Sequence, residues 1–132
     1  MSKSGFIRVA AASPTLKVAN TEYNTEQIIE CAKEAAESGA AVVLFPELSV
    51  SSYTCADLFY QQQLYNKNLE GLKRIIDASA SLNTVIIAGF YLRLANSLYN
   101  CAAVIQRGAL LGIVPKMFLP NSREFYEGRW FA

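Results

Sequence analysis

Residues 41–48, AVVLFPEL, are the stretch that decides the fold class. The run AVVLF at 41–45 is apolar throughout, which is typical of a buried strand, and Pro46 ends it. A helical pattern over about 65–81 follows, and TVIIAG at 84–89 is a further apolar strand. Strand, helix and strand in this order predict a crossover between parallel strands in an α/β fold.

The segment before this stretch repeats the same order. FIRVAAA at 6–12 predicts a strand that is buried on both faces. A helix is expected from Asn24, as its N-terminal cap, to about Ser38, with Gly39 in the left-handed conformation that follows a helix. The apolar stripes expected on the two helices are Ile28, Ala32, Ala35 and Ala36 on the first, and Leu69, Leu72, Ile76 and Ala80 on the second.

The segment after 84–89 predicts two antiparallel strands. Asn96 and Ser97 mark a turn, 99–106 forms the next strand, and Gly108 turns the chain into a last strand at 109–114. The whole pattern predicts an α/β layered sheet with mixed strand directions.

Composition excludes several classes of function. The chain has 132 residues, 52% of them hydrophobic, which is enough for one packed domain. Its net charge of +1 gives no basic excess for nucleic acid or an anionic membrane, and no run of about 20 apolar residues could span a bilayer. With no histidine, Ser-His-Asp catalysis, Cys-His catalysis and His-ligated metal sites are all excluded within the chain. We therefore expect a soluble, cytoplasmic protein without a metal.

The segment 120–132, PNSREFYEGRWFA, is unusual for the end of a domain. Two large aromatic residues stand next to the end of the chain, and no helix follows to close the open sheet. We expect a chain that is cut within a domain, although a tail folded back on the core would also fit.

Glu47 and Lys116 are the best candidates for chemistry. Each follows a proline at the end of an apolar strand, and ligands gather at strand ends in open α/β sheets. A carboxylate held there can act as a general base, and an ammonium can stabilise a developing oxyanion. Taken singly, Glu47 is better interpreted as a solvated loop glutamate or one that pairs with a helix N-terminus, and Lys116 as a surface lysine that ends a strand. Together they fit a nucleophile that is activated by a carboxylate and stabilised by an ammonium.

None of the three cysteines is a convincing nucleophile. Cys55 lies in the loop after Glu47, but no basic neighbour obviously lowers its pKa, so a structural role is favoured. Cys31 and Cys101 lie within a predicted helix and strand and are expected in the core. All three are expected to be free thiols in a reducing compartment. Tyr53, in the same loop as Cys55, is read either as part of a binding surface or as core.

Two short motifs resemble signatures of the nitrilase, or carbon–nitrogen hydrolase, superfamily: FPEL at 45–48 and VPK at 114–116. Within it the chain resembles the glutaminase domains of bacterial glutamine-dependent NAD synthetases. The residues that carry this narrower resemblance are GFIRVAAASP at 5–14, LYNCAAVIQRGALLGIVPK at 98–116 and FLPNSREFYEGRWF at 118–131.

The resemblance implies a nitrilase-type α-β-β-α sandwich, of which residues 1–132 hold only the N-terminal half. It implies that Glu47 is the general base of a Glu-Lys-Cys triad, that Lys116 stabilises the oxyanion, and that Glu124 supports the lysine and the substrate. The nucleophilic cysteine would lie beyond Ala132, so this piece alone should hydrolyse nothing.

The chain differs from the proteins it resembles at two positions near the expected site. These usually have glycine at position 52, before Tyr53, where this chain has Ser52. Many have tyrosine where this chain has Ser122. The resemblance implies that Tyr53 and Ser122 lie near the glutamine substrate.

The function implied is hydrolysis of glutamine to supply ammonia. A synthetase domain, absent here, would use ATP and Mg²⁺ to amidate nicotinic acid adenine dinucleotide, and the parent would be a homo-oligomer; no cofactor is implied within residues 1–132. Two alternatives remain open: a stand-alone nitrilase-type amidase, and a non-catalytic fragment or subunit.

Overall fold

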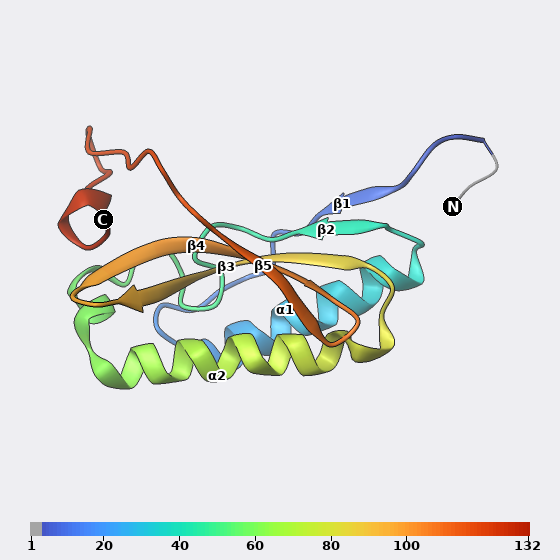
Figure 1. The fold of residues 1–132 in the computed structure, drawn as a ribbon, viewed down its shortest axis with the longest axis horizontal. Helices are drawn as coiled ribbons and strands as arrows, with labels where there is room; N and C mark the ends of the chain where they lie inside the picture. The colour runs from blue at the N-terminus through green and yellow to red at the C-terminus, as the bar shows by residue number, and fades with distance from the viewer. Residues whose placement is uncertain (1–3) are drawn as a thin grey trace.

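The computed structural model describes residues 4–132, which form a mixed five-stranded sheet with both long helices on the same face (Figure 1). The strands lie side by side in chain order; the first three run parallel, and the last three form antiparallel neighbours. This confirms the predicted α/β class and the mixed strand directions. The strands are β1 (Val9–Ala11), β2 (Val42–Leu44), β3 (Val85–Leu94), β4 (Ser97–Gln106) and β5 (Ala109–Pro115).

Helix α1 spans Thr21–Glu37, and its N-terminal cap is Asn20, whose Oδ1 accepts a hydrogen bond from the Tyr23 backbone N at 3.1 Å. The prediction of Asn24 as the cap is therefore wrong. Asn24 is buried inside the helix, and its amide bonds the backbone of Lys17 and of Val50. A loop backbone buried against the helix needs such a partner, which local sequence does not reveal. Gly39 has a φ of +81°, which confirms its predicted left-handed conformation.

Helix α2 spans Gln62–Ala78 and ends in a short 3-10 turn, Ser79–Ser81. Its buried face is rotated from the predicted stripe, since Leu69 is partly exposed. The cause is Gly71, where a Cβ would lie only 2.5 Å from Thr25 Oγ1 of α1. The helices touch through this small residue, so the buried residues of α2 are Leu64, Asn68, Gly71, Leu72 and Ile75.

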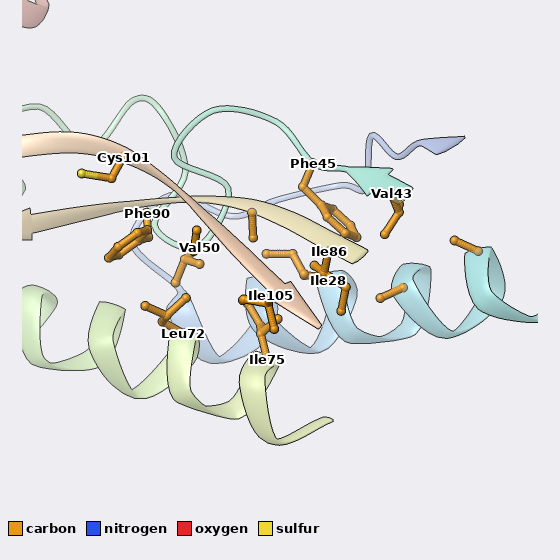
Figure 2. Packing of buried hydrophobic residues seen from close by; sticks show 14 of the residues in the cluster. Ile28, Val43, Phe45, Val50, Leu72, Ile75, Ile86, Phe90, Cys101 and Ile105 are labelled. Atoms are coloured by element: carbon orange, nitrogen blue, oxygen red, sulfur yellow. The ribbon is translucent and has the colours of Figure 1, made fainter. Parts of the chain in front are cut away.

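The core lies between the sheet and the two helices (Figure 2). Ile28 of α1 and Ile75 of α2 pack against Ile86 of β3 and Ile105 of β4, all of them buried. None of the helices in residues 4–132 is long and apolar enough to cross a membrane.

The other face of the sheet is apolar but open. The register places Leu44, Ile87 and Val104 in one row across β2, β3 and β4, opposite the side that meets the helices. Leu44 is 51% exposed and Val114 of β5 is 58% exposed. The prediction that the first strands are buried on both faces is wrong for residues 4–132, because these residues supply one helical layer only.

Candidate active site

Glu47 lies in the tight loop that follows β2. This loop packs on β3 at Gly89, where a Cβ would lie 2.3 Å from Leu48 N. The Val50 backbone N donates to Gly89 O at 3.1 Å, and Leu48 has a positive φ of +52°. Only glycine at position 89 allows this close approach, so Gly89 sets the position of Glu47. A lone glycine in a strand is the signal that could have indicated it.

Lys116 lies directly after β5, and its backbone N donates to Asn100 O of β4 at 2.8 Å. Its Nζ is 2.5 Å from Glu47 Oε1 and 2.9 Å from Glu127 Oε1. The two strand-end residues singled out from the sequence therefore lie in direct contact, across 69 positions of chain.

Glu127 is the second carboxylate on Lys116, and sequence reasoning missed it. It begins the short 3-10 turn Glu127–Arg129 and is only 2% exposed. The predicted supporting contact from Glu124 is wrong, because Glu124 lies on an exposed turn next to Arg123, whose φ is +56°. That turn changes the direction of the chain and brings the glutamate three residues later to the lysine.

Asn100 is a further residue that the sequence reasoning missed. It is 4% exposed in the middle of β4, and its Nδ2 donates to Glu47 Oε1 at 2.5 Å and to Glu127 Oε2 at 3.3 Å. The available signal was an amide within an otherwise apolar stretch of a predicted strand. A buried amide needs partners, and here both partners are carboxylates.

Glu47, Asn100, Lys116 and Glu127 form one connected group of side chains. Tyr53 contacts this group, whereas Ser122 does not. The Tyr53 hydroxyl donates to Glu127 Oε1 at 2.8 Å. The preceding residue, Ser52, has a φ of +77°, a conformation that favours glycine, so this loop keeps its left-handed turn without one. Ser122 is exposed in the loop between Lys116 and Glu127.

The electrostatics of the group favour charged partners. Burial raises the pKa of Glu127, but hydrogen bonds from Lys116, Tyr53 and Asn100 outweigh burial and hold that pKa below its ordinary value. Burial lowers the pKa of Lys116, and Glu47 and Glu127 more than reverse this, so its pKa is raised. Burial, together with Glu127, raises the pKa of Tyr53. At neutral pH the group therefore holds an ammonium, an ionised Glu127 and a neutral phenol.

A hollow of about 310 Å³ opens beside this group on the bare face of the sheet. Glu47, Asn100 and Lys116 form its polar end, and Leu44 and Val114 contribute to its apolar side. A carboxylate and an ammonium at one end of a small hollow can remove a proton from a nucleophile and stabilise an oxyanion.

None of the three cysteines hydrogen-bonds to the site within residues 4–132, although Cys101 directly follows Asn100 and is among the residues that line the hollow. Cys55 is 2% exposed, donates its thiol to Ser51 O, and has a pKa raised by burial. Cys101 packs into the core below the sheet, and burial raises its pKa too. The pKa of Cys31 is raised by burial and by Glu34 and Glu30. In residues 4–132, no thiol hydrogen-bonds to Glu47 or Lys116.

The fold and the site define a hydrolase class, and the chain belongs to the carbon-nitrogen hydrolase family, whose model matches residues 8–129. It matches the N-terminal region of glutamine-dependent NAD(+) synthetases. It is 39% identical over 128 residues to the enzyme of that name from Mycobacterium tuberculosis, covering 97% of this chain and 19% of that protein. Against the one from Acinetobacter baylyi, identity is 32% over 131 residues, covering 98% of this chain and 23% of the other.

Solved structures agree with this assignment. The glutamine-dependent NAD(+) synthetase of Cytophaga hutchinsonii has a TM-score of 0.89 and 28% identity, covering 96% of this chain and 21% of that one. A nitrilase-superfamily amidase from Nesterenkonia has a TM-score of 0.81 at 19% identity, over 96% of this chain and 47% of that one, and supports the fold. The chain thus spans about a fifth of the length of the synthetases it matches.

Proposed function

We propose that this chain is part of the glutaminase unit of a glutamine-dependent NAD synthetase, with Glu47 as general base and Lys116 as the oxyanion-stabilising residue. The observation that carries the proposal is the 2.5 Å contact between Glu47 Oε1 and Lys116 Nζ at the polar end of the hollow. The match to synthetases over 97% of the chain supports the choice of reaction.

The nucleophile in this proposal is a cysteine of the parent protein outside residues 1–132. Glu47 removes its proton, the thiolate attacks the side-chain amide carbon of glutamine, and Lys116 stabilises the resulting oxyanion. Glu47 returns the proton to the leaving nitrogen, which departs as ammonia and leaves a thioester. Water, deprotonated by Glu47, then hydrolyses the thioester to glutamate and frees the thiol.

The remaining parts of the proposal concern the parent. Tyr53 and Ser122 flank the glutamine, and the ammonia passes to a synthetase domain that uses ATP and Mg²⁺ to amidate nicotinic acid adenine dinucleotide. That protein is a cytoplasmic homo-oligomer. The 132-residue chain alone is inactive, because two members of a triad cannot form the acyl intermediate.

The test compares two nitrogen sources in the parent protein. Glu47→Gln and Lys116→Met are expected to lower NAD formation from glutamine by roughly 10²- to 10⁴-fold. NAD formation from free ammonia should be unchanged, because it bypasses the hydrolase. Glu70→Gln, an exposed glutamate paired with Lys67, is the matched control. Equal loss with both nitrogen sources, or full activity with glutamine, would contradict the proposal.

A further inference from the structure

Asn100 joins the two carboxylates of the site through one amide group. The Nδ2 amide has two hydrogens, and the structure uses one for Glu47 Oε1 and one for Glu127 Oε2. The backbone oxygen of Asn100 accepts from the Lys116 backbone N at 2.8 Å. One residue of β4 therefore contacts all three charged members of the group.

The charges of the group explain why an amide suits this position. Glu47 and Glu127 share a single ammonium, so a further acidic side chain would add repulsion, and a further basic one would compete with Lys116 for the carboxylates. An amide donates to both carboxylates without adding charge. Because Asn100 is 4% exposed, water cannot readily replace these hydrogen bonds.

The hydrogen bonds also distinguish the two oxygens of Glu47. Within residues 4–132, the hydrogen bonds that this carboxylate accepts, from Lys116 and from Asn100, both end on Oε1. Oε2 is therefore left to take a proton. If the carboxylate rotated about its Cγ–Cδ bond, Oε1 and Oε2 would exchange places and this distinction would be lost.

We propose that Asn100 is a positioning residue, which fixes the Glu47 carboxylate with Oε2 toward the hollow and holds Glu127 on the opposite side of Lys116. This deepens the proposed function and rests on it. Asn100 touches neither the nucleophile nor the leaving group; it acts through the orientation of the base and of the ammonium.

Two variants of Asn100 and one control test the inference in the parent protein. Asn100→Asp keeps the shape but replaces the amide donor with an acid, and Asn100→Leu removes all polar contacts. The control is Asn68→Leu, because Asn68 is also buried but, within residues 4–132, its side chain bonds the backbone of Tyr91 and no group of the site. The readouts are kcat and KM for glutamine, and the pKa of Glu127 followed by NMR of its side-chain carboxyl carbon.

Both Asn100 variants are expected to lower kcat by about 100-fold, with KM changed by less than about 3-fold. The pKa of Glu127 should rise by about one unit, because its ionised form loses a donor. Asn68→Leu should lower thermal stability but leave kcat and the Glu127 pKa unchanged.

The inference is overturned if Asn100→Asp keeps the wild-type kcat and Glu127 pKa, or if Asn68→Leu reproduces both changes. Should Asn100→Leu fail to fold, the isosteric Asn100→Asp decides alone. Failure of the proposed function is a separate result, namely a wild-type parent that does not hydrolyse glutamine. Even if the parent does not hydrolyse glutamine, the measured pKa of Glu127 in the Asn100 variants still tests whether Asn100 acts on that carboxylate.

Discussion

A buried carboxylate such as Glu127 needs several donors to remain charged. Lys116, Tyr53 and Asn100 supply them, and Glu127 is 2% exposed. Glu124, on the exposed turn three residues earlier, makes no hydrogen bond to Lys116. The two glutamates are therefore expected to behave differently when mutated.

Glu127→Gln is expected to lower glutamine hydrolysis by the parent on the order of 100-fold, because Lys116 loses one of its two charged partners. Glu124→Gln should have a much smaller effect. Steady-state kcat for both variants is the measurement. A larger loss with Glu124→Gln would restore Glu124 as the supporting residue and contradict the geometry.

The lowered pKa of Glu127 also predicts how stability depends on pH. In the folded protein the pKa of Glu127 lies below its ordinary value of 4.5, so the carboxylate stays ionised at a lower pH than it does in the unfolded chain. Its contribution to stability is therefore complete above about pH 4.5 and is lost as the pH falls through the lower, folded value. Urea unfolding from pH 7 down to pH 3 should show a steeper loss for the wild-type chain than for Glu127→Gln. Parallel curves for the two proteins would contradict this.

A substitution at Gly89 tests whether the close approach of the sheet to the loop sets the position of Glu47. A Cβ there would lie 2.3 Å from Leu48 N and 2.7 Å from Pro46 O, which are backbone atoms of the Glu47 loop. Gly89→Ala is expected to shift this loop, cost about 1–3 kcal/mol of unfolding free energy and abolish most glutamine hydrolysis in the parent. The matched control is Gly112→Ala in β5, where a Cβ meets nothing within 4 Å. Equal effects at Gly89 and Gly112 would show that the close approach is unimportant.

Among the elements of the fold, two short 3-10 turns contact each other next to the site. Asp57, in the turn Ala56–Tyr60, accepts from Trp130 Nε1 at 3.0 Å and pairs with Arg129 Nε at 3.3 Å. Arg129 and Trp130 directly follow Gly128 in the turn that carries Glu127, so Asp57 holds that turn against the loop after Glu47.

Asp57→Ala is expected to loosen the turn that carries Glu127 while changing stability little, by about 0–1 kcal/mol, since the ion pair is exposed. Trp130 is the single tryptophan of the chain, so its fluorescence reports the change directly. The emission should shift to longer wavelength in Asp57→Ala and remain unchanged in Asp77→Ala, an exposed aspartate near the end of α2. An unshifted Asp57→Ala spectrum would argue against this contact.

The elements show what local sequence can predict. The apolar runs predict β2, β4 and β5 closely, because strand periodicity and the prolines at 46 and 115 are local signals. β3 continues to Leu94, well past its predicted end at residue 89. Local sequence predicts Asn24 as a helix cap and cannot show its true partners, Lys17 and Val50, because these are set by tertiary packing. Strand ends single out Glu47 and Lys116 as candidates, but their direct contact is visible only in the structure. Asn100 and Glu127 depend on strand register and on a turn with a left-handed residue.

For the molecule as a whole, the open sheet face is an exposed apolar surface. Leu44 and Val114 are more than half exposed on it, and Ile87 and Val104 lie between them in the same surface. An apolar face of this kind favours association with a second apolar surface.

The isolated 132-residue chain is therefore expected to self-associate as its concentration rises. Sedimentation velocity over a range of concentrations measures this. Leu44→Lys, on the open face, should reduce association, and Lys73→Ala, on exposed α2, should not. A monodisperse, cooperatively melting monomer at every concentration would contradict the expectation.

We have proposed that this chain supplies the base and the ammonium of a glutaminase, while the nucleophile lies outside it. The most direct test treats the parent protein with a glutamine analogue that carries a reactive diazoketone and identifies the labelled residue by peptide mapping. We predict one labelled cysteine outside residues 1–132, with labelling lost in Glu47→Gln. Labelling of Cys55, Cys31 or Cys101 would contradict the proposed function and place the nucleophile within this chain.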